Sequence, residues 1–342
     1  MAAPKKRGAQ TVQFQNPPVI LAAAAVAGPK EAEGPLGKTF DRVSGEPYYG
    51  QKTWEKAEQR MLQDAMEIAL NKAGLRAADM DFLLAGDLLN QIIAANFTAR
   101  SLAIPFFGLY GACSTLYEAL TLGAILIDGG FAEHVLVGAS SHYGTAERQF
   151  RFPTELGGQR SMTAQWTVTG AGAAVLARAG AGPVITHATV GKVIDLGQGD
   201  SSDMGAAMAP AAVDTIVTHL RDTGRSAADY ELFITGDLGA YGKKIVEQLV
   251  LNENYDIRVR YTDCGILVFS GDQDVHAGGS GCGCSAVVTC GYLLQKLAAG
   301  ELKRFIGIGT GALFSPCSYQ QGETVPGIGH AVVIEAGEPV RN

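Results

Sequence analysis

The sequence repeats part of itself, and this internal repeat constrains the possible folds more than any other feature. Three segments recur in the same order: DFLLAGDL at 81–88 as ELFITGDL at 231–238, ACS at 112–114 as GCS at 283–285, and GAGAAVLARAG at 170–180 as GIGHAVVIEAG at 327–337. Three matches in one order with nearly equal spacing rarely arise by chance. The chain therefore contains two copies of one folding unit.

Each copy alternates strand-like and helix-like segments. Such alternation predicts an α/β fold in which each half holds a mostly parallel sheet with crossover helices on its faces. The halves are expected to meet near residue 180, which gives an N-terminal half at 1–180 and a C-terminal half at 181–342. About the first ten residues are expected to form a flexible tail. Hydrophobic residues make up 47% of the chain and charged residues only 18%, which suits extensive two-sided burial.

Hydrophobic spacing and turn residues predict the order of elements in the first half. The predicted strands are Val19–Gly28, Asp81–Ala85, Phe106–Leu109, His134–Gly138 and Gly170–Ala179. The predicted helices are Trp54–Ala73, Leu89–Leu102 and one that begins at Ser114 or Thr115 and stops before Gly129. Polar loops are predicted at Pro29–Lys52 and Ser140–Thr163.

A single cysteine, Cys113, precedes the last of these helices. The helix is apolar on nearly all sides, as is its copy headed by Cys284, so both are expected to form a central layer between two sheets. This gives an α-β-α-β-α layered arrangement. Ser114 and Thr115 are expected to cap the first turn, and the helix dipole is expected to lower the pKa of the Cys113 thiol. The thiolate could be a nucleophile, or the same amides could hold the carboxylate or phosphate of a ligand.

The net charge and the cysteines of the chain exclude several classes of function. A net charge of -7 and an isoelectric point near 5.4 argue against nucleic acid as a partner. The six cysteines show no regular pairing, so we expect reduced thiols and no metal site. Val19–Gly28 is too short, and too far from the basic residues before it, for a signal peptide. No run approaches the roughly 18 apolar residues that span a bilayer.

The duplicated α/β pattern, with a buried helix headed by a GACS-type cysteine, resembles the thiolase and ketoacyl synthase superfamily over nearly the whole chain. Four stretches resemble more narrowly a family of sporulation proteins: PPVILAAAAVAGPKEAEGPLG from Pro17, GACSTLYEALTLGA from Gly111, PTELGGQRSMTAQWTVTGAGAA from Pro153 and HAGGSGCGCSAV from His276. This resemblance implies a thiolase-like fold in a protein concerned with dipicolinic acid, pyridine-2,6-dicarboxylate, during spore formation and germination.

The resemblance also implies where catalytic residues would lie. Condensing members of the superfamily use a cysteine as acyl acceptor and two polar residues, His with His or Asn, on loops of the second half. Cys113 matches the cysteine, and His276 resembles one of the histidines. At the position of the other histidine the sequence has Thr235, Gly236 and Asp237. Neither glycine nor aspartate donates to a developing oxyanion at neutral pH as imidazole does, so we expect a pocket that has lost its catalysis.

The candidate ligand-binding residues are Cys113, Ser114, His142, Arg151, Gly236, Asp237 and His276. His142 follows a predicted strand end, where α/β sheets usually open their ligand crevice. Arg148, Arg151 and Arg160 lie in the loop after it. Arginine binds carboxylates in a bidentate manner, and dipicolinate carries two of them, so at least one of the three is expected to contact the ligand.

The expected function is non-catalytic binding of dipicolinic acid, free or as its calcium chelate, for uptake into the developing spore and release at germination. No cofactor is expected. The resemblance implies membrane-embedded partners of the same stage V sporulation A system, a peripheral position at the spore inner membrane, and a homodimer. An alternative is an acyltransferase or thiolase-type condensing enzyme with Cys113 as its nucleophile. A third hypothesis is a scaffold whose pocket is vestigial.

Overall fold

The computed structural model describes residues 5–150 and 160–337. The first half of the chain forms these strands: β1 Lys6–Arg7, β2 Thr11–Gln13, β3 Val19–Ala27, β4 Arg42–Val43, β5 Phe82–Gly86, β6 Phe106–Gly108, β7 His134–Ser141, β8 Trp166–Thr167 and β9 Gly170–Ala177. Its helices are α1 Pro29–Ala32, α2 Trp54–Ala73, α3 Ile93–Leu102, α4 Thr115–Asp128 and α5 Tyr143–Phe150.

The second half follows the same alternation of strands and helices. Its strands are β10 Val184–Thr189, β11 Leu232–Thr235, β12 Tyr261–Asp263, β13 Gly279–Ser280, β14 Arg304–Ala312 and β15 Gly327–Glu335. Its helices are α6 Met204–Thr223, α7 Gly239–Asn252, α8 Cys264–Val268, α9 Cys282–Val288, α10 Leu294–Ala298 and α11 Pro316–Gln320.

The main sheet has a mirrored strand order. Its hydrogen-bonded path runs β12-β11-β14-β15-β10-β3-β9-β7-β5-β6, so each strand of one half has a counterpart at the same distance from the centre. In each half three strands are parallel to one another, and β9 or β15 is antiparallel to both of its neighbours. The halves join where Val19 of β3 pairs with Val184 of β10. The sequence repeat thus appears as a repeat of topology.

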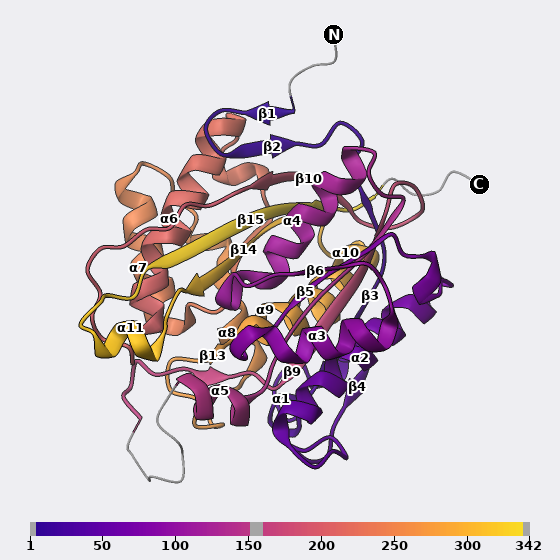
Figure 1. The fold of residues 1–342 in the computed structure, drawn as a ribbon. Helices are drawn as coiled ribbons and strands as arrows, with labels where there is room; N and C mark the ends of the chain where they lie inside the picture. Colours follow the sequence, from indigo (N-terminus) through magenta and orange to yellow (C-terminus); the bar gives the residue numbers. More distant parts are fainter. Residues whose placement is uncertain (1–4, 151–159, 338–342) are drawn as a thin grey trace.

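Helices form three layers around the two groups of strands (Figure 1). α2 and α3 cover the outer face of the first group, and α6 and α7 cover the outer face of the second. α4 lies between the groups, because it packs against β5 and β7 on one side and against β14 and β15 on the other. Three hydrophobic cores fill the spaces between these layers. The predicted α-β-α-β-α arrangement is confirmed, while the boundary near residue 180 stays a prediction because strands of both halves share one sheet.

The two longest helices, one in each half, begin and end in the same way. α2 and α6 each have 20 residues and pack on equivalent strands of the two halves. The side chains of Thr53 and Asp203 cap their first turns by accepting a backbone amide. Both helices end at a glycine in the left-handed region, Gly74 and Gly224. The predicted helix Trp54–Ala73 is confirmed in both of its bounds.

Some local predictions are wrong. The helix predicted from Leu89 starts only at Ile93, because Gln91 and Ile92 adopt positive φ and interrupt it. Lys6–Arg7, within the predicted tail, pairs with β2, which in turn pairs with β10. The predicted polar loop Pro29–Lys52 contains α1 and β4.

The predicted loop Ser140–Thr163 also contains regular structure. β7 continues to Ser141, and α5 follows it directly. The sequence does not predict this helix because the aromatic and charged side chains of the segment form no clear apolar face. α5 is the helix that shapes the cavities described below.

Two further findings concern the cysteines and the lengths of the helices. All six cysteines are free, which agrees with the predicted reduced thiols. Within residues 5–150 and 160–337, the search for a helix both long and apolar enough to cross a lipid bilayer found none.

Candidate functional site

Cys113 lies in a short 3-10 turn that leads into α4. The hydroxyls predicted to cap the helix bond backward instead: Ser114 Oγ donates to the Gly111 carbonyl at 2.7 Å, and Thr115 Oγ1 donates to the Ala112 carbonyl at 2.7 Å. The capping prediction is therefore wrong, because in a tight turn these hydroxyls find nearer acceptors than the first-turn amides. Ser114 is fully buried and stabilises the turn that presents Cys113.

Cys113 and Asp237 line one small pocket of about 60 Å³. The thiol hydrogen-bonds with the Asp237 carboxyl. The carboxyl also accepts from the Thr310 hydroxyl at 2.7 Å and from the Gly281 amide at 3.2 Å. Gly281 has a φ of +96°, and a Cβ there would lie 2.7 Å from Ser141 Oγ, so this donor position requires glycine. The pocket holds a thiol and a carboxyl in a fixed arrangement.

Burial governs the ionisation of both groups. It raises the pKa of the Cys113 thiol well above its usual range, and the nearby Asp237 carboxylate adds to the rise. The predicted fall in this pKa is therefore wrong, because loss of water and a neighbouring acid outweigh the helix dipole. Burial also raises the pKa of Asp237 to about 7, against the opposing hydrogen bonds from Thr310 and Cys113. Near neutral pH a neutral thiol faces a partly protonated acid.

Two other residues predicted for this site, Gly236 and His276, do not line the pocket of Cys113. Gly236 is packed closely at the end of β11, where a Cβ would lie 3.3 Å from the Ser285 side chain, so it provides space for the neighbouring α9. His276 lines neither pocket of this region. Its Nδ1 lies 2.7 Å from the Ser161 carbonyl oxygen and its Nε2 lies 3.2 Å from the Asp274 carboxylate. The structure therefore does not bring His276 to the cysteine.

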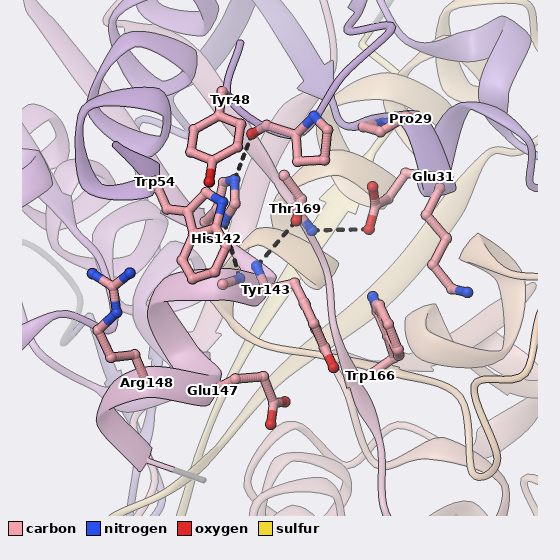
Figure 2. A pocket seen from close by; sticks show the side chains of 13 residues that line it. Pro29, Glu31, Tyr48, Trp54, His142, Tyr143, Glu147, Arg148, Trp166 and Thr169 are labelled. Atoms are coloured by element: carbon pink, nitrogen blue, oxygen red, sulfur yellow. Dashed lines mark hydrogen bonds between the residues drawn. The ribbon is translucent and has the colours of Figure 1, made fainter. Parts of the chain in front are cut away.

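A larger cavity, of about 260 Å³, lies beside α1, α5 and the start of α2 (Figure 2). His142 lines this cavity and not the pocket of Cys113. His142 Nδ1 accepts from the Gly144 amide at 3.1 Å, which leaves the proton on Nε2, 2.8 Å from the Pro47 carbonyl oxygen. Burial lowers the pKa of His142, so the ring is neutral at pH 7.

Two aromatic stacks wall the larger cavity, one on each side of the view in Figure 2. In the first, the Trp54 ring stacks with Tyr48 and His142, with centroids 5.9 and 6.3 Å apart. In the second, the Tyr143 and Trp166 rings stack at 3.7 Å with an angle of 4°. The chain has only two tryptophans, and both line this cavity. Such flat apolar walls suit a planar aromatic ligand.

Cations lie against the rings of both stacks. Lys30 Nζ lies 4.3 Å from the centroid of the Trp166 ring, and the Arg148 guanidinium lies 4.8 Å from that of Trp54. Cation–π contacts of this kind hold a charged side chain against a ring without neutralising it. Arg148 also pairs with Glu55 at 2.7 Å, on the exposed side. Lys30 Nζ also donates to the Gln273 carbonyl at 2.5 Å. Both cations line the cavity.

Two acids complete the wall. Glu31 is only 1% exposed, and its Oε1 accepts from the Thr169 amide at 2.9 Å (Figure 2). Its Oε2 has no hydrogen-bond partner among the described residues. Burial raises the pKa of Glu31 to about 7, although the Thr169 amide and the Lys30 charge oppose the rise. Glu147 of α5 also lines the cavity.

α5 separates the two cavities. Tyr143 and Glu147 on this helix line the larger cavity, whereas Ala146 and Phe150 line the pocket of Cys113. The residues predicted to form one site are thus divided between two.

Of the arginines, Arg148 lines the larger cavity, as described above. The Arg160 guanidinium lies 5.1 Å from the centroid of the Trp166 ring and bonds to Asp274 at 2.9 Å. Arg151 lies outside the described residues.

Lys30, Glu31, Trp54 and Trp166 line the larger cavity but are not predicted from the sequence. Their signal in the sequence is weak: both tryptophans stand in polar segments, TWEKAE at 53–58 and AQWTVT at 164–169, where a large apolar ring is unusual. Only the fold brings these segments together. β8, which holds Trp166, pairs with β13 of the second half and is positioned by it.

The chain matches the family model for stage V sporulation protein AD over residues 8–335. It is 50% identical to the stage V sporulation protein AD of Bacillus subtilis (strain 168) over 331 residues, which cover 97% of this chain and 98% of that protein.

Solved structures share the fold at much lower identity. A variant of OleA from Xanthomonas campestris superposes with a TM-score of 0.64 and 16% identity, covering 97% of this chain and 100% of that one. The 3-oxoacyl-[acyl-carrier-protein] synthase III of Aquifex aeolicus VF5 gives a TM-score of 0.59 and 14% identity, covering 93% and 99%. At these identities the likeness shows the fold alone, and it confirms the predicted thiolase-like architecture.

Proposed function

Because the chain belongs to the stage V sporulation protein AD family, we propose that it binds dipicolinic acid, pyridine-2,6-dicarboxylate, without transforming it. The ligand lies in the larger cavity beside α1 and α5, not in the pocket of Cys113. The observation that carries the proposal is the presence of two cations and two aromatic stacks around one cavity of suitable size.

The two candidate sites differ in volume. A pocket of about 60 Å³ holds the equivalent of about two water molecules, whereas dipicolinate is a six-membered ring with two carboxylates. The larger cavity, about 260 Å³, approaches the lower end of the range usual for ligand pockets. Among the described residues, no lysine or arginine lines the smaller pocket, and its Asp237 repels a dianion.

The larger cavity offers groups for each part of the ligand. The pyridine ring packs against the Trp54 and Trp166 stacks, and the two carboxylates pair with Lys30 and Arg148. Arginine suits a carboxylate in particular, because its planar donors match the two oxygens. His142, neutral and bonded on both nitrogens, positions the wall without contributing charge.

The pocket of Cys113 supports binding without a chemical reaction. Asp237 stands where condensing enzymes of this fold are expected to hold a histidine, and burial raises the pKa of the thiol. A neutral thiol is a poor nucleophile, so this pocket lacks the activated cysteine that acyl transfer needs.

In the cell, we propose that the protein serves dipicolinate uptake into the developing spore and its release at germination. It acts with membrane-embedded proteins of the stage V sporulation A system and lies at the periphery of the spore inner membrane. The ligand enters free or as its calcium chelate.

Titration calorimetry of the purified protein with dipicolinate, with and without equimolar calcium, tests the proposal. We expect saturable binding, weakened about tenfold or more by Arg148→Gln, since a charged hydrogen bond is lost, and by Trp54→Leu, since an aromatic contact is lost. The matched controls are Cys113→Ala and Asp237→Asn, which alter the smaller pocket and are expected to leave the affinity unchanged.

The outcomes of this titration are distinct. Lack of binding at millimolar dipicolinate would overturn the function itself. Loss of binding in Cys113→Ala, with Arg148→Gln unaffected, would move the ligand to the smaller pocket.

Acyl transfer at Cys113 is a second candidate, favoured by one observation: the thiol hydrogen-bonds with a carboxyl whose pKa of about 7 suits a general base. Incubation with acyl-coenzyme A of several chain lengths, followed by intact mass measurement, tests it. This candidate requires an acyl adduct that disappears in Cys113→Ala. An unmodified mass across all chain lengths excludes it.

A further inference from the structure

The N-terminal hairpin, residues 5–13 with β1 and β2, lies at the top of the view in Figure 1, whereas α1 and α5 lie at the bottom. Neither cavity described above is lined by its residues. β2 pairs with residues 187–189 of β10, on the side of β10 where β3 pairs only through Val19. β15 pairs with the same three residues on the other side. The hairpin therefore covers a strand edge that would otherwise be open.

One carboxylate holds the turn of the hairpin. Asp222, in the last turn of α6, accepts the amides of Ala9, Gln10 and Thr11 at 2.8, 2.8 and 3.0 Å. A Cβ at Gly8 would lie 1.9 Å from Asp222 Oδ1, and the φ of Gly8 is +52°, so the turn closes on this carboxylate because residue 8 is glycine. Burial opposes the ionisation of Asp222, but the amides of the turn lower its pKa. This attachment is therefore kept in mild acid.

The second attachment is a buried chain of hydrogen bonds. Thr11 Oγ1 lies 2.9 Å from Thr189 Oγ1, which lies 2.8 Å from His219 Nδ1. His219 Nε2 lies 2.5 Å from the Tyr230 hydroxyl, and Arg225 Nη1 donates to that hydroxyl at 3.3 Å. The two threonines, the histidine and the tyrosine are fully buried. The chain runs from the hairpin through β10 to α6 and the loop that follows it.

The direction of these hydrogen bonds requires a neutral His219. Arg225 can only donate, so the Tyr230 oxygen accepts from it and the Tyr230 hydroxyl donates to His219 Nε2. The ring proton then lies on Nδ1 and is donated to Thr189. A second proton, on Nε2, would leave the Tyr230 hydroxyl between two donors, with no other hydrogen-bond partner among the described residues. It would also bury an imidazolium close to a guanidinium.

A second buried histidine, His187 of β10, lies edge to face with His219, with ring centroids 6.3 Å apart. Its Nδ1 lies 3.0 Å from Thr186 Oγ1, whose hydroxyl donates to Glu335 at 2.9 Å. Nδ1 therefore carries the proton of a neutral ring. Burial lowers the pKa of His187 to about 4 and that of His219 to about 3. Both rings are neutral while the hairpin is in place at neutral pH.

The charged groups that face the two histidines come from every element packed around them: Arg7 of β1, Asp222 of α6, Arg225 of the loop after α6, Arg304 of β14 and Glu335 of β15. The cations oppose protonation of the rings. Of the two acids, Glu335 pairs with Arg304 at 3.0 Å, and Asp222 holds the turn of the hairpin. Neither acid is therefore available as the main partner of an imidazolium.

We propose that the N-terminal hairpin is an acid-released cover of β10: protonation of His187 and His219 breaks the chain to Thr11, and residues 5–13 leave the sheet while the rest of the fold stays. The moving segment ends before Phe14, which is buried in the largest core. At its other end, Lys5 pairs with Asp128 at 3.0 Å and is partly exposed. Release opens the backbone of residues 187–189 to another strand.

The sign of the pH effect follows from the neutral rings. Both folded pKa values lie below the ordinary value of 6.5, so the histidines favour the attached hairpin fully above about pH 6.5. Their contribution is lost as the pH falls from 6.5 toward 4 and 3. The equilibrium between attached and released hairpin is expected to shift by up to about tenfold per pH unit for each histidine.

Hydrogen exchange of the wild-type protein, followed by mass spectrometry between about pH 4.5 and 7, tests the proposal. After correction for intrinsic exchange rates, the amides of residues 9–13 and 187–189 are expected to lose protection at a pH where those of β9 keep it. Tryptophan fluorescence over the same range reports on the rest of the fold, since Trp54 and Trp166 line the larger cavity, and it is expected to stay unchanged.

Variants assign the effect to the histidines. The double variant His187→Gln, His219→Gln keeps groups that donate and accept hydrogen bonds but do not titrate, so the pH dependence of the hairpin amides is expected to disappear. His330→Gln is the matched control. Burial also lowers the pKa of His330 to about 4, but its Nδ1 accepts from the Gly191 amide at 3.2 Å and not from the chain that reaches Thr11. This control is expected to behave as the wild type.

Three results would overturn the proposal. The first is a hairpin whose amides stay protected down to about pH 4.5. The second is loss of protection in the hairpin and in β9 at the same pH, which would show unfolding of the whole molecule. The third is a double variant that keeps the pH dependence of the wild type. The first two results are measured on the wild type, so the test does not depend on the folding of a variant.

Discussion

Asp237 and Cys113 show how burial changes the chemistry of a residue whose type suggests reactivity. A cysteine at the start of a helix is expected to be acidic, yet this thiol is partly buried and lies beside a buried carboxyl, and both raise its pKa. The two effects that raise its pKa act at short range, whereas the helix dipole acts on a turn whose own hydroxyls bond backward.

The raised thiol pKa predicts slow alkylation of Cys113. Iodoacetamide at about pH 7 to 8 is expected to modify the exposed Cys317 well before Cys113, because the thiolate is the reactive form. Asp237→Asn is expected to speed the reaction of Cys113 at alkaline pH, since a negative neighbour is removed. Peptide mass mapping over time checks both. Faster labelling of Cys113 than of Cys317 in the wild type would contradict the prediction.

Asp237 also gives a pH-dependent contribution to stability. Its folded pKa, about 7, lies above the unfolded value, so its contribution is fully present below the unfolded pKa and is lost as pH rises through about 7. Relative to wild type, Asp237→Asn is expected to gain about 1 kcal/mol in free energy of unfolding between about pH 6 and 8. Denaturant unfolding at both values measures this difference, in which the effects of the buried histidines cancel. Asp256→Asn, at an exposed site, is the control and is expected to show no such change.

Among the elements, α5 stands out because it separates the two cavities. It follows β7 directly, it gives one face to each cavity, and its Gly144 packs against Trp54. A Cβ at Gly144 would lie 2.3 Å from the Trp54 ring, closer than any packed contact allows. The helix and the aromatic stack therefore meet only because this residue has no side chain.

Gly144→Ala is expected to displace the Trp54 ring and reduce affinity for dipicolinate by tenfold or more, on the order of 1 kcal/mol or above, with a smaller loss of stability. Calorimetry and thermal unfolding check the two effects. Gly45→Ala, where nothing lies within 4 Å of the added atom, is the matched control. Unchanged affinity in Gly144→Ala would show that the Trp54 stack is not part of the binding wall.

At the scale of the whole molecule, the sheet ends at two edges, β6 and β12. Among the described residues β6 pairs with β5 on one side only, and Phe107, 49% exposed, and Tyr110, 48% exposed, lie on or just after it. Exposed apolar side chains beside an open strand favour pairing with another strand. A second copy related by a two-fold axis would pair β6 with itself in the antiparallel sense, which satisfies both copies at once.

We therefore predict a homodimer through β6. Phe107→Lys is expected to give a monomer, because a charge on each copy would meet its own image across the axis. Size-exclusion chromatography with light scattering checks the mass. Val259→Lys, at a residue 90% exposed beside β12, is the control and is expected to remain dimeric. A monomeric wild type, or a dimer that survives Phe107→Lys, would reject this interface.

The sequence predicts the layers of this molecule well and its larger cavity poorly, for one physical reason. Layers follow from periodic apolar patterns and from the repeat, and both are written locally in the chain. The cavity instead joins Lys30, Trp54, His142 and Trp166, which are far apart in sequence and share no pattern. The motif of Cys113 is conspicuous because it is local, and the fold places this residue on the other side of α5, in the smaller pocket.

The mirrored strand order has a consequence for how such a site can evolve. β7 leads into α5 in one half, and its counterpart β14 leads into the short α11 in the other. Two copies of one unit began with equal possibilities, yet within the described residues α5 lines the larger cavity and α11 does not. The second contributes β13, which braces Trp166 from outside its own half. The two copies are thus unequal: the first half supplies the residues that line the larger cavity, and the second half supplies the strand that pairs with β8.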